Sequence, residues 1–401
     1  MRWLTFFVCL CLTLIAEAQT YQLLKNRESE LSALRKTGSD EKIQTWWNSL
    51  ITANQIPLIS EDSVYFFYKG PAKSVEWMGD FNGWGFQKNV HNKGKLIDGT
   101  DIWILKSSFP KDARLDYKIL LDGSNWILDP ENKHQQWSGV GGGSPNSELR
   151  MPDWKEDPTQ IDRKNNHKGT LISDVLVNSK VLGYQVTYTV YLPYEFSKSQ
   201  NFPCLYVTDG YEYLHPKLGN MNTVLDNLIE DKKIIPVIVV FIDHRAPIDR
   251  SNNKRMQELA MNAKYLEFFT QELIPQIETE YPVIRDAQHR AIMGTSMGGL
   301  TATYFAFSKP DIFGMAGIQS PAFYTRPQIY SLCSNPADPK MKISMTAGLI
   351  NDTSPESRKM KDILEANSCL YKYREVNEGH SWGNWSRLID DILIDLFAKT
   401  N

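Results

Sequence analysis

The chain has 401 residues, of which 42% are hydrophobic and 23% are charged, and its formal net charge is −3. This composition is that of an ordinary globular protein, and the length suggests two domains or one large domain with an extension. A weakly negative chain has no general electrostatic attraction to nucleic acid or anionic membranes, so we expect neither as a partner. No Cys-x-x-Cys motif or His/Cys cluster indicates a metal site, and we expect no metal or organic cofactor.

The first 18 residues have the pattern of a secretory signal peptide. Arg2 supplies a positive charge, residues 3–15 are apolar, and the Ala-Glu-Ala sequence at 16–18 is a cleavage site with small residues. The alternative is an uncleaved membrane anchor, but the apolar stretch is too short to span a bilayer comfortably. We therefore expect cleavage before Gln19 and a secreted or periplasmic product that leaves the membrane.

The next part of the chain divides by its sequence pattern into three segments. Residues 19–58 contain helical patterns such as EKIQTWWNSLI, whereas 59–150 contain short aromatic and β-branched runs such as SVYFFYKG and LDYKILLDG. Repeated short strands separated by turn-forming clusters predict a small all-β sandwich. The stretch SGVGGGSPNSELR and the following residues 151–167 have the glycine, proline and charge content of a linker. Its glycines lack the spacing of a dinucleotide or phosphate loop, so we expect an ordinary loop.

Residues 168–401 alternate between strand and helix patterns. The run IIPVIVVFID is continuously apolar, as in a strand buried on both faces, and NAKYLEFFTQELIPQIETEY follows as an amphipathic helix. The buried strand HRAIMG and the helix GLTATYFAFSKP come next. This succession predicts an α/β fold with a mainly parallel sheet covered by helices on both faces.

A Gly-Thr-Ser-Met-Gly sequence at 294–298 joins the strand HRAIMG to the following helix. A serine on such a sharp strand–turn–helix connection needs small neighbours, which Gly294 and Gly298 provide. The same context is that of the nucleophile elbow of α/β hydrolases, which exposes a serine hydroxyl at the carboxyl edge of the sheet. We therefore interpret Ser296 as a nucleophile; the alternative is a purely structural turn.

A serine nucleophile needs a base and an acid, and hydrolases of this architecture place them in the order Ser, acid, His. Only His380 follows Ser296 in the mature chain, in the loop sequence VNEGHSWGNW, although a surface histidine is the alternative. Asp352 lies between them, after the apolar strand MKISMTAG, and would hold the imidazole tautomer. Glu356 is the second candidate acid, and Asp352 could instead cap the helix that follows it.

The oxyanion hole of such a site is built from backbone N–H groups. One comes from the residue after the nucleophile, which is Met297 here. The second comes from a loop after an earlier strand, and LYVTDGYEYLHP provides Gly210 or Tyr211. Backbone donors leave little trace in side-chain identity, so either residue fits.

From about residue 167 to the end, the chain resembles a family of α/β-hydrolase esterases that includes enterochelin, feruloyl and acetyl xylan esterases. The matching segments include YQVTYTVYLP, LYVTDGYEY, RMQEL, RAIMGTSMGGLTATYFAFSKPDIFG, AGLINDT and EGHSWGNW. The resemblance implies an α/β-hydrolase fold and a serine carboxylic ester hydrolase with Ser296, Asp352 and His380 as its triad. Some members have only a Ser–His pair. The segments WMGDFNGWG and YKILLDGSNWILDP resemble early-set immunoglobulin-like domains, the group that contains glycogen-binding modules.

Two substrate hypotheses are compatible with this resemblance. In the first, the enzyme releases feruloyl or acetyl groups from plant polysaccharide, and the β-domain helps to hold the glycan. Aromatic faces stack on sugars, although tryptophans also fill the core of a small sandwich. Eight of the ten tryptophans of the mature chain precede residue 155: Trp46, Trp47, Trp77, Trp84, Trp103, Trp126, Trp137 and Trp154.

In the second hypothesis, the enzyme opens the ester bonds of a ferric catecholate siderophore. Such an anionic substrate would favour basic residues, and the segment DHRAPIDRSNNKRMQEL supplies them, unless it is simply a solvated loop. They are His244, Arg245, Arg250, Lys254 and Arg255.

Other residues are candidates for the substrate pocket. In the family pattern, Arg255 and Glu258 of the same segment resemble a structural pair near the pocket. Candidates for an aromatic pocket wall, or else for core packing, are Trp382, Trp385, Tyr211, Phe323 and Tyr324.

A third hypothesis is a catalytically silent glycan- or ligand-binding protein that keeps the hydrolase fold. A complete Ser/Asp/His set argues against it. The cysteines indicate no function: Cys333 and Cys369 could bridge in an oxidising compartment, whereas Cys204 lies in a strand-like run and should be buried and inert.

Overall fold

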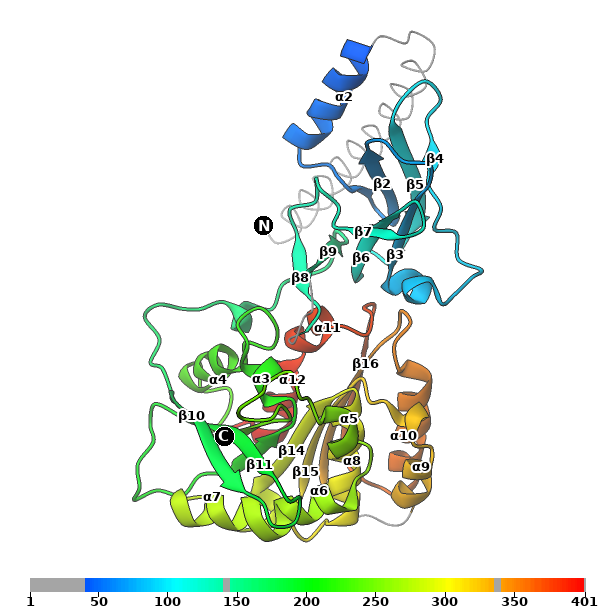
Figure 1. The fold of residues 1–401 in the computed structure, drawn as a ribbon. Coiled ribbons are helices and arrows are strands. Elements are labelled where there is room, and N and C mark those ends of the chain that lie inside the picture. The colour runs from blue at the N-terminus through cyan, green and yellow to red at the C-terminus, as the bar shows by residue number, and fades with distance from the viewer. Residues whose placement is uncertain (1–39, 140–144, 335–339, 400–401) are drawn as a thin grey trace, which may run out of the picture. The chain divides into compact units, whose positions relative to one another are not determined.

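The structure is a computed structural model that describes residues 40–139, 145–334 and 340–399 (Figure 1). The predicted signal peptide and the first part of the predicted helical segment lie outside the described residues. Within the described ranges, no helix combines the length and the apolar character that crossing a bilayer requires. The described chain forms two compact units, the first with residues 40–136 and 145–155, the second with 137–139, 156–334 and 340–399.

The first unit begins with the expected helix in EKIQTWWNSLI, which is α2 (Asp40–Thr52). Its apolar side chains Ile43, Trp46, Trp47 and Leu50 recur at helical spacing and are all buried. They pack against apolar side chains of the neighbouring strands, so tertiary contact stabilises this helix.

Two sheets follow α2 in the first unit. Phe66 of one sheet contacts Trp77 and Tyr117 of the other, so the sheets enclose an aromatic core. The first sheet contains, in spatial order, β1 (Leu58–Ser60), β2 (Ser63–Lys69), β5 (Ile102–Ser108) and β4 (Lys95–Leu96). The second contains β3 (Val75–Gly79), β6 (Arg114–Leu121), β9 (Pro145–Arg150) and β8 (Gln135–Trp137), with β7 (Asn125–Ile127) paired to β6. A 3₁₀ helix, η1 (Asp80–Gly85), follows β3.

The stretch that reads as a linker is more structured than its composition indicates. This stretch contains strand β9. The polar side chains of β9 are buried and have polar partners: Glu148 accepts from Arg114 at 2.8 Å and Asn146 donates to Asp116 at 3.0 Å. Farther along, the amide of Gln160 donates to the backbone oxygen of Ser386 at 2.7 Å. The loop after residue 155 is therefore fixed to the second unit, where it includes η2 (Pro158–Gln160).

The second unit contains an eight-stranded mixed sheet. The first two pairings, β10–β11 and β11–β13, are antiparallel, and the pairings from β13 to β17 are parallel. This matches the expected mainly parallel sheet. In spatial order the strands are β10 (Thr170–Asn178), β11 (Gln185–Leu192), β13 (Ile238–Asp243), β12 (Cys204–Val207), β14 (Arg290–Thr295), β15 (Met315–Gln319), β16 (Lys342–Gly348) and β17 (Leu370–Val376).

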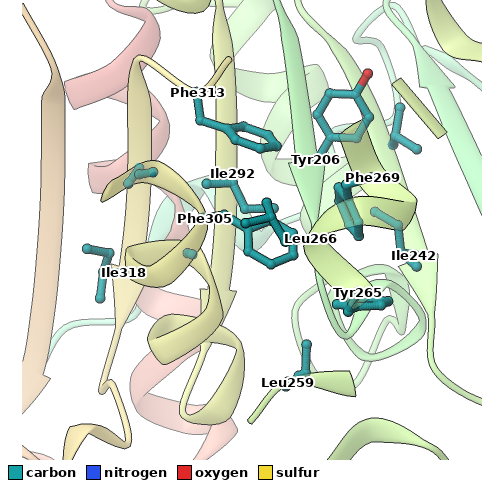
Figure 2. Close-up of a cluster of buried hydrophobic side chains, with 14 of the residues drawn as sticks. Tyr206, Ile242, Leu259, Tyr265, Leu266, Phe269, Ile292, Phe305, Phe313 and Ile318 are labelled. Carbon is teal, nitrogen blue, oxygen red and sulfur yellow. The ribbon is translucent and has the colours of Figure 1, made fainter. Parts of the chain in front are cut away.

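Helices cover both faces of this sheet (Figure 1). In β14, Ile292 points into one apolar cluster, whereas Ala291 and Met293 point into the other. Helices with side chains in the first cluster, part of which is drawn in Figure 2, are α6 (Ala263–Phe268), α7 (Ile274–Glu280), α8 (Met297–Ser308), α9 (Gln328–Cys333) and α10 (Ser354–Ala366). Those in the second cluster are α3 (Gly210–Leu214), α4 (Met221–Glu230), α11 (Trp382–Arg387) and α12 (Ile389–Phe397).

Shorter helical elements complete the second unit. They are α5 (Arg255–Glu258), η3 (Phe269–Leu273), η4 (Ala287–His289) and η5 (Phe323–Thr325). The three cysteines of the described chain are buried free thiols, so the bridge considered between Cys333 and Cys369 is not formed in this structure. Burial raises the pKa of the Cys204 thiol to about 12, as expected for an inert side chain.

Candidate active site

Ser296 occupies the turn between β14 and α8. Its φ of 57° and ψ of −113° are unusual for a residue with a side chain, as in a strained nucleophile elbow. A Cβ at Gly294 would lie 2.2 Å from the Thr208 hydroxyl oxygen, and one at Gly298 would lie 2.4 Å from the same atom. Both glycines are therefore required for the turn to pack against the loop after β12.

The fold brings Ser296, His380 and Asp352 into hydrogen-bonding contact. His380 lies between β17 and α11, and its Nε2 is 2.9 Å from the Ser296 Oγ. Asp352 lies in the loop between β16 and α10, and its Oδ1 is 2.6 Å from the His380 Nδ1. The carboxylate accepts the Nδ1 proton, which leaves Nε2 free to accept the serine proton. The arrangement has the connectivity of a nucleophile, a base and an orienting acid.

Asp352 is held firmly in this position. Its side chain is buried, and its Oδ2 accepts from the Ser320 hydroxyl at 2.5 Å and from the Gly348 N–H at 2.6 Å. Asp352 does not cap α10, because the N-cap of that helix is Thr353. Glu356, the other candidate acid, lies in the first turn of α10, and the carboxylate bonded to His380 is that of Asp352.

The candidate oxyanion donors lie at the starts of two helices. Met297 begins α8, and Gly210 and Tyr211 begin α3; the first N–H groups of a helix have no acceptor within it. Asp209, immediately before α3, has a positive φ of 56°, which turns the chain sharply after β12. A Cβ at Gly210 would lie 2.5 Å from the backbone carbon of Phe241, so only glycine fits this close approach.

Arg255 connects the loop before α3 to the strand before Ser296. Its guanidinium donates to both carboxylate oxygens of Asp209, at 2.5 and 2.9 Å, and to the backbone oxygen of Thr295 at 3.2 Å. Arg255 and Glu258, the candidate structural pair near the pocket, have different hydrogen-bonding partners. Each residue bonds to a group at the end of a neighbouring strand, Arg255 to Asp209 and Glu258 to His244.

His244 is a residue whose role the sequence did not reveal. It is buried, its Nδ1 is 2.5 Å from the Glu258 Oε2, and its Nε2 accepts the Asp209 N–H at 3.1 Å. Tyr184 donates its hydroxyl to the Glu258 Oε1 at 2.7 Å; burial and the Glu258 carboxylate raise the pKa of Tyr184 far above its usual range, so the hydroxyl keeps its proton. The signal in the sequence is that His244 directly follows a continuously apolar strand that ends at the carboxyl edge.

The remaining basic side chains of this segment are balanced by acidic or aromatic partners. Arg245 donates to both oxygens of Asp243, at 2.9 and 2.7 Å. Arg250 bridges Asp243 and Asp174, at 2.9 and 2.8 Å. The Lys254 ammonium lies 4.3 Å from the centre of a tyrosine ring. The predicted basic surface is therefore largely neutralised.

The five aromatic candidates for the pocket differ in exposure. Trp382 and Phe323 are core residues, and the Trp382 indole donates to the Glu212 carboxylate at 2.8 Å. Trp385 is also buried, and its ring lies edge-on to the His380 imidazole at 4.9 Å, where it supports the ring. Tyr211 and Tyr324 are exposed and can contact a substrate.

No group of three or more histidine, cysteine, aspartate or glutamate side chains with metal-binding geometry occurs in the described ranges. The side chains of Ser296, His380 and Asp352 thus form a continuous hydrogen-bonded chain, and the candidate backbone donors lie at the starts of α8 and α3. This arrangement can add a serine hydroxyl to a carbonyl and stabilise the oxyanion that forms.

Comparison with curated proteins identifies relatives among esterases. The chain is 26% identical over 314 residues to an endo-1,4-beta-xylanase/feruloyl esterase of Xylanibacter ruminicola, covering 75% of this chain and 40% of that protein. It is 24% identical over 250 residues to the iron(III) salmochelin esterase of Escherichia coli O6:H1, covering 57% of each. The chain thus spans less than two thirds of these two proteins. A Bacillus subtilis protein of uncharacterised function, YjcH, is 25% identical over 227 residues, covering 54% of this chain and 92% of that protein.

Solved structures show the same fold. The enterobactin esterase of Shigella flexneri superposes with a TM-score of 0.67 at 20% identity, covering 90% of this chain and 98% of that chain. The sequence profile of the Putative esterase family matches residues 179–396, which is more than half of the chain. The chain therefore belongs to this family of carboxylic ester hydrolases.

Proposed function

We propose that the protein hydrolyses esters through an acyl-enzyme on Ser296, with His380 as base and Asp352 as its orienting acid. The observation that carries this proposal is the continuous chain of hydrogen bonds, 2.9 Å from Ser296 to His380 and 2.6 Å from His380 to Asp352. His380 takes the serine proton as Oγ attacks the carbonyl carbon, and it then protonates the leaving alcohol. Water repeats the sequence on the acyl-enzyme.

Two backbone donors stabilise the tetrahedral oxyanion in this mechanism. One is the N–H of Met297, and the other is that of Gly210 or Tyr211. Support comes from their positions at the starts of α8 and α3, on either side of the close packing between Gly294 and Thr208. Loss of one such donor costs about 3 kcal/mol in the activation barrier.

The substrate that we propose is an acylated plant polysaccharide with feruloyl or acetyl esters on xylan, reached by a secreted enzyme. The relative from Xylanibacter ruminicola named xylanase/feruloyl esterase supports this, since its alignment covers three quarters of this chain. Charge supports it too, because Arg245, Arg250 and Arg255 are each paired with a carboxylate. A neutral glycan needs no unpaired cation for binding.

A ferric catecholate siderophore is the second candidate. The salmochelin esterase among the relatives favours it, as does the shared fold with enterobactin esterases. A ferric catecholate siderophore is anionic, and the paired arginines of the basic segment offer little net positive charge to attract it.

A contribution of the first unit to glycan binding would depend on few tryptophans. Trp46, Trp47, Trp77 and Trp103 are buried, in agreement with a core role for half of the eight. Trp126 is 47% exposed and is the candidate for stacking on a sugar. The assignment of this unit as an early-set immunoglobulin-like module stays a prediction.

Two assays test the proposal. Wild-type protein should hydrolyse p-nitrophenyl acetate, and Ser296→Ala should abolish that hydrolysis. An active Ser296→Ala variant would rule out this nucleophile. An inactive wild-type protein would favour a catalytically silent binding protein. Mass spectrometry of products released from feruloylated arabinoxylan, acetylated xylan and ferric enterobactin then identifies the substrate. Release from ferric enterobactin alone would replace the polysaccharide assignment.

A further inference from the structure

A cavity of about 530 Å³ lies in the second unit beside α3. Its walls come from β10, β11, β13, α3 and the segment after β13, and Gly210 and Tyr211 are among its lining residues. The same two residues are the proposed second oxyanion donors. A ligand in this cavity would therefore contact the start of α3, which follows Asp209, and Arg255 bonds both to Asp209 and to the backbone oxygen of Thr295 beside Ser296. The volume is within the range of small-molecule binding sites.

One wall of the cavity contains a β-bulge. The pairing register of β10 shifts between Ile172 and Val175, and Asp174 inside the bulge has a positive φ of 54°. Bulges redirect side chains, often next to functional sites, and a positive φ in a residue other than glycine is strained. Here the bulge carries the Asp174 carboxylate to Arg250, at 2.8 Å.

The charged side chains of the cavity form a continuous row. Asp174 bonds to Arg250, Arg250 bonds to Asp243, and Asp243 bonds to Arg245. The Arg245 guanidinium lies 3.4 Å from the centre of the Tyr211 ring. Two arginines and two aspartates balance, so the row offers many fixed hydrogen-bonding groups without net charge.

These properties identify the chemistry of the ligand. A sugar chain presents hydroxyl groups that pair with such donors and acceptors, and it has apolar ring faces that pack on an aromatic side chain. Tyr211, which is 42% exposed, can provide that face. An anion would find no uncompensated cation here, and an acyl chain would desolvate four charged groups.

We propose that this cavity is a saccharide subsite, which holds the sugar chain while its ester is presented to Ser296. The inference rests on the proposed function, since it assigns a place to the polysaccharide part of the substrate. It locates sugar binding in the esterase unit itself.

Binding is tested by calorimetric titration of xylotetraose into the Ser296→Ala protein, which cannot turn over an ester. Xylotetraose should bind, and adding Asp174→Ala or Arg250→Ala should weaken its affinity at least tenfold. Ser173→Trp, placed on the exposed bulge, should also block binding by filling the cavity without removing a charge. Arg358→Ala, which breaks an exposed ion pair with Glu375 on α10 and β17, is the matched control and should bind as the parent does.

Kinetics give the second readout. In protein that retains Ser296, Asp174→Ala and Arg250→Ala should lower kcat/KM for acetylated xylotetraose at least tenfold more than they lower kcat/KM for p-nitrophenyl acetate. Failure of xylotetraose to bind, or equal affinity in the cavity variants, would overturn the subsite even if p-nitrophenyl acetate hydrolysis depends on Ser296. Hydrolysis that survives Ser296→Ala would instead overturn the proposed function.

Discussion

Two of the histidine–carboxylate pairs in the second unit lie at the carboxyl edge of the sheet and have almost the same geometry. The imidazole Nδ1 is 2.6 Å from Asp352 in His380 and 2.5 Å from Glu258 in His244. The pairs differ in their surroundings. The His380 side chain is 32% exposed and its Nε2 reaches the Ser296 hydroxyl, whereas the His244 side chain is 3% exposed and its Nε2 accepts a backbone N–H.

This difference shows that the carboxylate alone does not make a histidine a catalytic base. In both pairs it fixes the tautomer, so that Nε2 is the accepting nitrogen. A serine hydroxyl can give its proton to that nitrogen and become a nucleophile, but a backbone amide keeps its proton. In the proposed mechanism His380 therefore accepts the Ser296 proton, whereas His244 accepts the Asp209 N–H and supports the loop before α3.

The largest effect should come from His380. Removal of the base in His380→Ala leaves the Ser296 hydroxyl without an acceptor, and kcat for p-nitrophenyl acetate should fall on the order of 10⁴-fold or more. Stopped-flow or steady-state absorbance at saturating substrate measures it. If His244→Ala caused the larger loss, the roles given to the two histidines would have to be exchanged.

A slightly smaller loss should follow a change at Asp352. In Asp352→Asn the neutral amide no longer stabilises the imidazolium and allows the wrong tautomer, so kcat should fall about 10³- to 10⁴-fold. KM should change little, because Asp352 is buried behind His380. The matched variant Glu356→Gln tests the other candidate acid and should keep near wild-type kcat; the reverse outcome would make Glu356 the acid.

Ser296 and the His380–Asp352 pair could be predicted from the sequence, because the local sequence around each residue indicates its role. Ser296 lies in a glycine-flanked turn between a buried strand and a helix, and His380 and Asp352 lie in loops after strands in the expected order. His244 also directly follows an apolar strand, but no nearby sequence motif indicates its role. Its partners Glu258 and Asp209 are 14 and 35 residues away, so only the fold brings them together.

The same limit applies to the fold. Continuous apolar runs correctly indicated the central strands and the helices around them. Strand β9 was missed because Asn146, Ser147 and Glu148 are polar yet buried; the partners of Asn146 and Glu148 come from β6, and that of Ser147 is the Asp129 N–H. Pattern recognition identifies strands by apolar side chains, whereas this strand is stabilised by polar contacts that are distant in the sequence.

A change at His244 should have an intermediate effect. His244→Ala removes the acceptor of the Asp209 N–H and releases the start of α3, which carries a proposed oxyanion donor, so kcat for p-nitrophenyl acetate should fall about 10- to 100-fold. KM should stay within about twofold, because a positioning residue acts on the transition state. His244→Gln keeps an oxygen that can accept this N–H and should recover part of kcat. Equal rates for both variants and wild type would mean that the loop needs no such support.

The smallest effect should appear at Asp390, a carboxylate without an imidazole partner. Burial, followed by the neighbouring carboxylates of Asp157 and Asp391, raises its pKa to about 7. An unfolded aspartate titrates near 3.9, so the folded protein binds more protons between about pH 4 and 7. Its free energy of unfolding should therefore fall as pH rises through that window and level off above it.

Asp390→Asn should remove this dependence. Its gain in unfolding free energy over wild type should grow from near zero at pH 4 to about 1–2 kcal/mol at pH 8, because solvent screening reduces the effect of a partly buried group. Urea unfolding followed by tryptophan fluorescence at the two pH values measures it. Asp395→Asn on the same helix is the control with the opposite sign: although burial opposes ionisation, Arg374 lowers the pKa of Asp395, and the variant should be less stable at pH 8. If the gain from Asp390→Asn were equal at both pH values, folding would not change the pKa of Asp390, and the expected rise in that pKa would be wrong.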